Sequence, residues 1–504
     1  MLNSRQLVVA RGALAVASVI ALSFGHARPA EAQSFSFNSS DIVVAVEGDG
    51  SNTGSYIDNQ AAPLTLYQYA VNGTTSATAA GSLELPQTTI AGGNYAISGE
   101  YGSSSEGTLQ LSGNGQYLTI MGYGINANTY NSTYDANGSG TALAQSPNTA
   151  AGGANVSRVI ALIGANGSVN TTTAITGVFN ENNPRSVFTQ DGTSFYISGQ
   201  GNKDTTGGVF YVSNLGATTA TAITGADTHS SSSGSFNQDT RDVQIVNGTL
   251  TVSVDSTEGT ASKGYNIDRI GTLGTVGTPP TTTLTAQPTA LSGINAAVTL
   301  SNGNGNSING STGSAYLSPE NYFYANATTL YVADSGDPKN GSSSGTAGVQ
   351  NNGDGGLQKW SLVNGTWKLD YTLASGLNLV LNGNDEATVE HGVSGLYGLT
   401  GKVVGGQVQL FATSYVLSDT DQTYLYGISD TLSDTSASQV TAESFTTLEA
   451  APADAEFKGV SLAPVPLPSS LLLLLSGLAL GAGVIFWRRS ALGRQYCNQM
   501  LLRI

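Results

Sequence analysis

The architecture of this chain can be inferred from the segment Asp242-Val243-Gln244-Ile245-Val246-Asn247-Gly248-Thr249-Leu250-Thr251-Val252-Ser253-Val254. It holds two β-rich runs separated by Asn247-Gly248, residues that accept the positive φ angles of a tight turn. This pattern predicts an antiparallel β-hairpin. Because no long helical pattern occurs between Ser34 and Ala463, we predict an all-β body.

The same pattern recurs along the chain. The second strands of five such hairpins are centred near residues 120, 197, 252, 332 and 411. Further β-rich runs follow several of the hairpins, for example at residues 209–212, 357–362 and 423–428. A repeated unit of four strands is typical of a β-propeller, in which each unit forms one blade.

The two ends of the body supply the strands of one further unit. Ile42–Val46 has the pattern of a second strand without its first, and Phe457–Leu462 that of a first strand without its second. Their pairing would close a ring and leave no exposed sheet edge. We therefore predict a six-bladed β-propeller closed by its N- and C-terminal strands. The alternatives are seven blades, if 124–157 or 288–320 holds further strands, an elongated β-sandwich, or a β-solenoid.

The N-terminal segment 1–32 has the organisation of a secretory signal peptide. Arg5 and Arg11 precede the apolar stretch 13–24, and Ala30 and Ala32 flank Glu31 as the small residues before Gln33. The apolar stretch is too short to form a stable membrane span. We predict cleavage between Ala32 and Gln33, which leaves residues 33–463 as the body.

The C-terminal segment 464–504 carries a second hydrophobic signal. Val465-Pro466-Leu467-Pro468 is followed by an uncharged run that ends at Trp487 and then by Arg488-Arg489. A helix over residues 468–487 would be about 30 Å long, enough to cross the hydrocarbon core of a bilayer. Positive charge stays on the cytoplasmic side, so we predict a single transmembrane helix with the body outside.

This tail resembles the PEP-CTERM sorting signal of exported bacterial proteins. Val465, Pro466, Leu467 and Pro468 stand where many members have Val-Pro-Glu-Pro, and Arg488 and Arg489 form the basic stop. The resemblance implies that an exosortase and the secretion machinery are partners. It also implies delivery to the cell envelope or extracellular matrix after transient anchoring in the inner membrane. The stretch 490–504 is longer than is usual in such tails, and a permanent single-span anchor is the alternative.

The body also resembles an uncharacterised family of exported bacterial propeller-like proteins. The segments that carry this resemblance are 46–50, 105–109, 330–334 and 457–460. The resemblance implies the fold and names no activity.

The body is acidic but poor in charged residues. The 18 Lys and Arg of the chain include three in the signal segment and four in the tail, and one of its 34 Asp and Glu lies in the signal segment. The body therefore has a formal charge of −22, which opposes nucleic-acid binding. Gly, Ser, Thr and Asn replace charged residues, as in exported proteins that meet glycans. Extracellular polysaccharide is therefore an expected partner.

Residues suited to catalysis are scarce in the body. Cys497 lies in the tail, and His229 and His391 are the histidines between residues 33 and 463. Such a sequence argues against a zinc site and against a catalytic constellation. We predict no cofactor, no catalytic residue and a non-enzymatic binding or structural role at the surface or in the matrix. The alternative is a calcium-dependent hydrolase or lyase that acts on an extracellular polymer.

The long loops hold the candidate ligand sites. They join second to third strands or successive blades, which places them on one face of a propeller. Tyr123, Tyr130 and Tyr134 stand among small polar residues, where exposed aromatic rings suit sugar stacking. A structural calcium ion is a further expectation, and its weakly matching oxygen ligands are Asp334, Asp337, Asp354, Asp419 and Asp421.

Overall fold

The structure, a computed structural model, describes residues 35–51, 56–132, 142–148, 155–202, 205–224, 239–255, 269–284, 288–294, 297–300, 313–336, 355–379, 391–418 and 420–466. The predicted signal peptide, with Ala30, Ala32 and Gln33, lies outside these residues. So do Leu467, Pro468, Arg488, Arg489 and the predicted span 468–487. Within the described ranges, no helix is long and apolar enough to cross a membrane.

Strands make up nearly all of the regular structure. In chain order they are β1 (Ile42–Gly48), β2 (Ala61–Asn72), β3 (Ser76–Glu84), β4 (Ser98–Glu100), β5 (Gln110–Leu111), β6 (Tyr117–Tyr123), β7 (Arg158–Gly164), β8 (Val169–Ile175), β9 (Pro184–Phe188), β10 (Phe195–Gly199), β11 (Gly208–Val212), β12 (Thr221–Ala222), β13 (Thr240–Val246), β14 (Thr249–Val254), β15 (Arg269–Leu273), β16 (Thr289–Ala290), β17 (Ala297–Leu300), β18 (Gly313–Tyr316), β19 (Pro319–Asn326), β20 (Thr329–Asp334), β21 (Gly356–Val363), β22 (Thr366–Leu373), β23 (Val393–Val404), β24 (Gln407–Val416), β25 (Tyr424–Thr431), β26 (Thr446–Ala450) and β27 (Ala455–Leu462). Helical structure in the same described ranges is limited to short elements such as α2 (Ala127–Asn131) and η3 (Ala437–Gln439).

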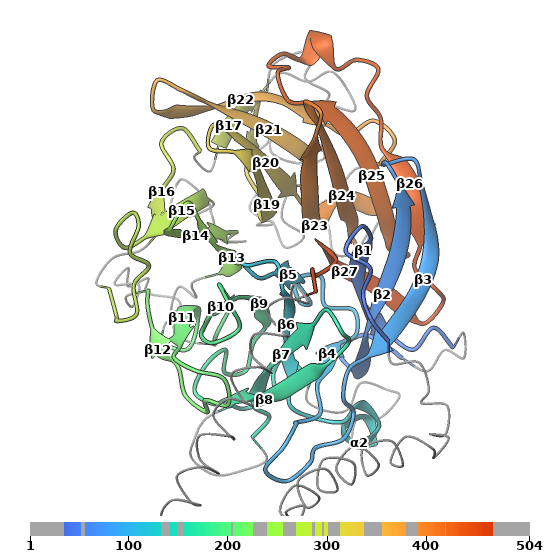
Figure 1. Ribbon diagram of the computed structural model, residues 1–504, viewed down its shortest axis with the longest axis vertical. Helices are drawn as coiled ribbons and strands as arrows, with labels where there is room; N and C mark the ends of the chain where they lie inside the picture. Colours follow the sequence, from blue (N-terminus) through green and yellow to red (C-terminus); the bar gives the residue numbers. More distant parts are fainter. Residues whose placement is uncertain are drawn as a thin grey trace, which may run out of the picture.

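The strands form antiparallel sheets arranged around a common centre (Figure 1). Four sheets contain four strands each, namely β9–β12, β13–β16, β19–β22 and β23–β26. A larger sheet of nine strands combines β1–β8 with β27, and β17 pairs with β18 in a separate small sheet. The predicted all-β, propeller-like ring is confirmed in this form, and the sandwich and solenoid alternatives are wrong.

The hairpins follow the turn chemistry of the sequence. β13 pairs with β14 across Asn247-Gly248, and Val246 lies opposite Thr249. Asn247 and Gly248 have φ angles of 50° and 77°, as a type I′ turn requires. The other four predicted second strands are present as β6, β10, β20 and β24.

The strands nearest the centre contact one another in a closed cycle. The cycle runs β5, β9, β13, β19, β23, β27 and back to β5 (Figure 1). We call these the inner strands. Apolar side chains fill the space between neighbouring sheets: Met121 and Ile160 of the nine-stranded sheet, for example, belong to one buried cluster with Ile197 and Phe210 of the β9–β12 sheet.

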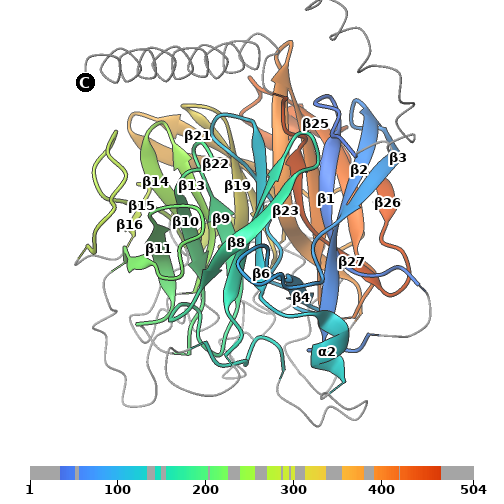
Figure 2. The ribbon, with the colours of Figure 1, turned by 60° about the horizontal axis from the view of Figure 1, so that its bottom comes forward.

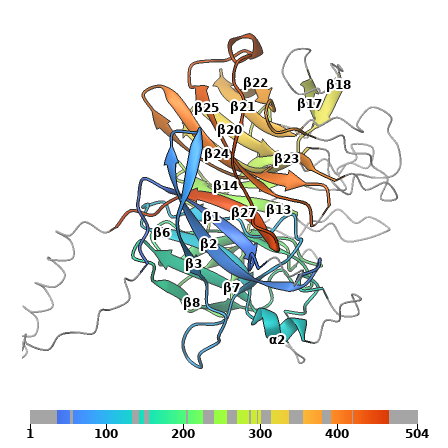
Figure 3. The same ribbon diagram turned by 90° about the vertical axis from the view of Figure 1, so that its right-hand side faces the viewer.

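The two ends of the chain close this cycle. β27 lies beside β1 (Figure 3), and Val44 is opposite Val460 in an antiparallel ladder. Phe457 of β27 is 1% exposed and packs with Ile42, Val44 and Tyr69. The predicted pairing of the chain ends is therefore confirmed.

Several strands, β2 and β3 among them, were not predicted from the sequence. β3 reads Ser-Ala-Thr-Ala-Ala-Gly-Ser-Leu-Glu and is almost entirely exposed, so it lacks the apolar alternation that marks a half-buried strand. It pairs with β2, which in turn pairs with β1 in the same sheet. Of the two segments that could have held further strands, 288–320 contributes β16 and the β17–β18 pair, whereas the described part of 124–157 contains α2.

The inner strands define two faces of the ring (Figure 2). The turns that follow them, such as Asn247-Gly248 after β13 and Gly405-Gly406 after β23, lie on what we call the turn face. The opposite face, at which the inner strands begin, we call the start face. It carries α2, since β6 ends there.

Replacing Phe457 with Ala should destabilise the protein by about 3–5 kcal/mol, since the large side chain is removed from the packed ladder that joins the two chain ends. The free energy of unfolding in urea measures this loss. Val465→Ala, at a side chain that is 51% exposed, is the control and should have little effect. A loss for Phe457→Ala no larger than that of the control would show that β27 does not hold the ring closed.

Candidate functional site

Charged side chains gather on the start face. Arg185, Arg241, Glu320 and Glu456 are each the second residue of an inner strand, namely β9, β13, β19 and β27. Equivalent positions in a strand direct their side chains to the same side. All four are buried, with exposed fractions between 3% and 5%.

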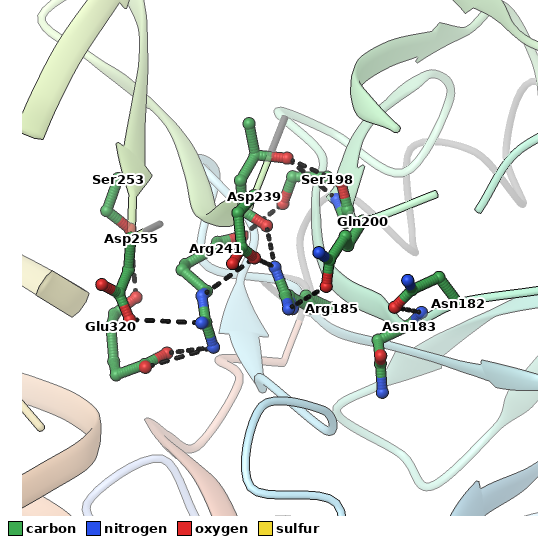
Figure 4. A network of polar contacts seen from close by, with 12 residues as sticks. Asn182, Asn183, Arg185, Ser198, Gln200, Asp239, Arg241, Ser253, Asp255 and Glu320 are labelled. Carbon is green, nitrogen blue, oxygen red and sulfur yellow. Dashed lines mark hydrogen bonds and ion pairs between the residues drawn. The ribbon is translucent and has the colours of Figure 1, made fainter. Parts of the chain in front are cut away.

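The first group of these residues surrounds two arginines (Figure 4). We call it the arginine cluster: Arg185, Asp239, Arg241, Asp255 and Glu320. Arg185 donates to Asp239. Arg241 reaches all three acids, since its Nε lies 3.4 Å from Asp239 Oδ1, its Nη2 3.2 Å from Asp255 Oδ2, and its Nη1 3.2 Å from both Glu320 oxygens. Ser318 Oγ donates to Asp255 Oδ1 at 3.1 Å.

Burial sets the protonation of the arginine cluster. Loss of solvent raises the pKa of Glu320 to about 8, against the opposing attraction of Arg241. Burial also raises the pKa of Asp255, while Arg241 and the Ser318 hydroxyl group oppose the change. The three acids raise the pKa of Arg241 well above its ordinary value, despite burial of the guanidinium. The cluster thus combines a fixed cation with a carboxyl group that keeps its proton at neutral pH.

The second group lies where the chain ends pair. We call it the closure cluster: Glu47, Glu106, Glu456 and Lys458. Glu47 of β1 is opposite Glu456 of β27 in the ladder. Lys458 Nζ lies 2.5 Å from Glu456 Oε2 and 3.4 Å from Glu47 Oε2, and it donates to the carbonyl oxygen of Ser103. The lysine offsets the repulsion expected between two like charges placed directly opposite.

The acids of the closure cluster also favour their protonated forms. Burial raises the pKa of Glu47 to about 8, although Lys458 opposes the shift. Burial raises the pKa of Glu106 to about 7, against hydrogen bonds from Tyr123 and Asn183. The Asn183 amide nitrogen lies 2.6 Å from Glu106 Oε1.

Two tyrosines contact the segment that carries Glu106. Tyr397 of β23 donates to the carbonyl oxygen of Glu106 at 2.8 Å. Tyr415 of β24 donates to Ser104 Oγ at 3.2 Å, and its pKa responds to the charges of Glu320 and Arg241 after the larger effect of burial. The segment 103–106, which carries Glu106 of the closure cluster, is thus hydrogen-bonded to β23 and β24.

Several carboxylate oxygens in these clusters lack a hydrogen bond. Among the described residues, neither oxygen of Glu47 has a hydrogen-bond partner, and the same holds for Oε1 of Glu320 and Oε1 of Glu456. Native proteins usually satisfy buried polar atoms, and exceptions concentrate at functional sites. These carboxylate oxygens, which lack hydrogen bonds although two of them lie in ion pairs, mark the start face as the candidate active site.

The structure changes the interpretation of the predicted tyrosines. Tyr123 is fully buried at the end of β6, where Arg158 lies 4.5 Å from its ring centroid and its hydroxyl group donates to Glu106. The expectation of an exposed Tyr123 ring is therefore wrong, because the strand directs this side chain into the protein. Tyr130 is partly buried in α2. Tyr134 lies outside the described residues, and sugar binding by Tyr130 and Tyr134 stays a prediction.

Two of the predicted calcium ligands, Asp334 and Asp421, lie in the described ranges and accept hydrogen bonds. Asp334 accepts hydrogen bonds from the backbone of Ser318 and Gly336, whereas Asp421 accepts from the backbone of Gly392 and Ser418 and contacts the His391 ring at 2.6 Å. Within the described ranges, no three His, Cys, Asp or Glu side chains are arranged to hold a metal ion. Asp337, Asp354 and Asp419 lie outside those ranges, and a structural calcium ion stays a prediction.

The sequence carries a signal for these clusters that the hairpin pattern alone does not reveal. Charged residues are only 10% of the chain, yet they stand at the start of the first strand in unit after unit. The pattern is visible in Pro184-Arg185, Thr240-Arg241, Pro319-Glu320 and Glu456-Phe457-Lys458. A charge repeated at the same position of a strand indicates a shared site at the centre.

Comparison with known proteins finds distant structural likeness to two enzymes. No family model and no curated protein matches the chain. The solved structure of Hadza microbial sialidase Hz136 is similar over 76% of this chain and 62% of its own, with 11% identity and a TM-score of 0.36. Sucrose-6-phosphate hydrolase from Lactobacillus gasseri is similar over 84% of this chain and 89% of its own, with 9% identity and a TM-score of 0.27. The chain thus spans less than two thirds of the sialidase.

The prediction that the chain is not an enzyme is corrected. It rested on the scarcity of His, Cys and clustered acids in the body, but the fold brings Asp239, Asp255 and Glu320 onto one guanidinium. The two solved structures named above carry the names of enzymes, a sialidase and a hydrolase. Their likeness is too distant to assign an activity to this chain, so any chemistry must follow from the clusters themselves.

Replacing Glu47 with Gln should flatten the pH dependence of stability. The folded protein holds the Glu47 proton up to about pH 8, whereas the unfolded chain releases it near its ordinary pKa. Stability therefore falls as pH rises from about 4.5 to about 8, and Gln removes this loss, which we expect to be about 2 kcal/mol or more. Unfolding in urea near pH 5 and near pH 9 tests the difference.

Glu84→Gln is the control for this measurement, because Glu84 is exposed on β3. It should keep the pH dependence of the unsubstituted protein. Equal pH dependence in Glu47→Gln and the unsubstituted protein would contradict the buried, proton-binding state assigned to Glu47.

Proposed function

We propose that the protein is a propeller hydrolase that cleaves glycosidic bonds in an extracellular polysaccharide, with its active site on the start face. The observation that carries this proposal is the pair of carboxyl groups held on one guanidinium. Arg241 contacts Glu320 through Nη1 and Asp255 through Nη2, each at 3.2 Å. Both acids thus lie within about 10 Å of each other, as in the acid pairs of glycoside hydrolases.

The two carboxyl groups divide the work of hydrolysis. Burial raises the pKa of Glu320 to about 8, so its carboxyl group is protonated at neutral pH. Glu320 donates this proton to the oxygen of the leaving sugar. Asp255, which accepts hydrogen bonds from Arg241 and Ser318, takes a proton from the attacking water. Water then adds to the sugar carbon as the bond to the leaving oxygen breaks, and Arg241 keeps both acids in place.

The charge of the two clusters favours a neutral or amino-sugar polymer as substrate. Six acids face three cations, namely Glu47, Glu106, Asp239, Asp255, Glu320 and Glu456 against Arg185, Arg241 and Lys458. Because Glu47 and Glu320 keep their protons at neutral pH, the two clusters carry little excess charge of either sign. Protonated and ionised carboxyl groups side by side can donate to and accept from the hydroxyl groups of a neutral sugar. The amide- and hydroxyl-rich surface agrees with this substrate class.

We further propose that the ring has six blades. The closed cycle of six inner strands supports this count. The nine-stranded sheet then comprises two blades, β27-β1-β2-β3 and β5-β6-β7-β8, which β4 links. In this arrangement the body 33–463 forms one domain between the signal peptide 1–32 and the tail 464–504.

The proposed place of action is outside the cell. The signal peptide directs export, and the tail 464–504 holds the protein in the inner membrane until an exosortase cuts at Val465-Pro466-Leu467-Pro468. The scarcity of charged residues in the body fits this destination.

Replacing Glu320 with Gln should lower the hydrolysis rate by about 100-fold or more, because Gln cannot donate the proton to the leaving oxygen. Asp255→Asn should cause a comparable loss. The measurement is release of reducing ends from a panel of neutral and amino-sugar polysaccharides at pH 7. Activity of the unsubstituted protein should fall above about pH 8, where Glu320 loses its proton.

Asp434→Asn, on the turn face, is the control and should leave the rate unchanged. Thermal unfolding must show that all variants are folded. Full activity in folded Glu320→Gln, or cleavage of none of the neutral and amino-sugar polymers, would refute the proposed chemistry.

The intact mass of the protein from its own host should match residues 33 to about 465, with any added glycan. Such a mass follows from removal of both the signal peptide and the tail. A mass that includes residues 471–489 would show a permanent anchor and would refute cleavage by an exosortase.

A further inference from the structure

The described chain ends on the turn face. After β27 the chain continues to Val465, whose N–H donates to the carbonyl oxygen of Gly115 at 2.7 Å in the turn between β5 and β6. The N-terminal residues reach the same face, since the Phe37 N–H donates to Ala165 in the turn between β7 and β8 at 2.9 Å. Both sequence signals therefore join the body at the face opposite the two charged clusters.

The tail leaves little room between this face and a membrane. Val465 and Pro466 are the last described residues, and the predicted span begins at Pro468. Leu467 separates them, and one residue reaches about 3.5 Å at most. When residues 468–487 cross the bilayer, the turn face must therefore lie at the lipid surface.

Exposed apolar side chains gather on the same face. Of the seven large apolar residues that are exposed in the described ranges, five lie in or beside turns of this face or at its chain exit. They are Val276, Val363, Val403, Val404 and Val465. Val404, before the Gly405-Gly406 turn, is 50% exposed, and Val276, between β15 and β16, is 77% exposed. Apolar side chains at the tips of hairpins can enter the boundary between lipid headgroups and acyl chains.

The turns of this face also carry little charge. The described hairpin turns contain no Lys or Arg, and their acidic residues are Asp191, Asp434 and Glu443. The body as a whole has a formal charge of −22, which an anionic lipid surface repels. A face whose described turns hold only three acids and expose valines is the part of this body that can approach lipid most closely.

We propose that the turn face is a membrane-contacting surface, which rests on the lipid bilayer while the tail is inserted and orients the start face away from it. This inference rests on the membrane anchor in the proposed function. It adds a fixed orientation, in which the charged clusters face outward to polymer even before the tail is removed.

Two cysteines at opposite ends of one hairpin test this orientation. Val404→Cys lies on the turn face, and Thr420→Cys is exposed beyond the other end of β24. β24 has ten residues, so the two sites are separated by about 33 Å. Both variants are made in the full chain with Cys497→Ser, which removes the single native thiol.

The variants are expressed in a bacterial host without an exosortase and labelled in spheroplasts with a polyethylene-glycol maleimide. Cys at 404 should react about tenfold more slowly in the membrane-bound chain than in a chain that ends at Pro466, because lipid headgroups cover it. Cys at 420 should react at the same rate in both chains.

Equal rates at position 404 in the bound and the truncated chain would overturn the inference, as would slow labelling of both positions in the bound chain. Recovery of the full chain in the soluble fraction would instead overturn the anchor itself. Hydrolysis by the truncated chain does not depend on either result, so failure of the proposed activity is recognised separately.

Discussion

The pairing of β1 with β27 holds the ring together. It joins strands more than 400 residues apart in sequence and completes the cycle of inner strands. The same ladder places Glu47 opposite Glu456 and brings Lys458 between them. Because β27 runs from the start face to the turn face, this one pairing also sets where the chain leaves the ring.

The two faces differ in chemistry because of how charge is distributed along the inner strands. Arg185, Arg241 and Glu320 occupy the second position of their strands, so closure of the ring collects them near the centre. Low dielectric around them strengthens each ion pair and raises the cost of every unpartnered acid. The described turns of the turn face hold no Lys or Arg and few acids, and they expose valines. A site for polar chemistry and a surface suited to lipid therefore lie at opposite ends of the same strands.

Much of the architecture could be predicted from local pattern. Asn247-Gly248 predicts its hairpin because few residues accept the required φ angles. For most of the other inner hairpins, the alternation of apolar and polar residues predicted the strands. β3 was not predicted, because it is an exposed edge strand of small residues and lacks an apolar pattern. Tyr123 was taken for a surface residue from its polar neighbours, although its own position at the end of β6 buries it.

Residue pattern alone was enough for the all-β class, the hairpin turns, the pairing of the chain ends and the expectation of export, because each depends on residues that are close together or on a simple apolar pattern. Which acids share a site depends instead on the packing of distant strands. Asp239 and Asp255 flank the β13–β14 hairpin, whereas Glu320 lies on β19, and Arg241 joins Glu320 to the other two only after β13 and β19 have packed together. The protonation of the buried acids could not be predicted from the sequence either. Burial at the centre of the ring, and not residue type, raises the pKa of Glu320 and Glu47.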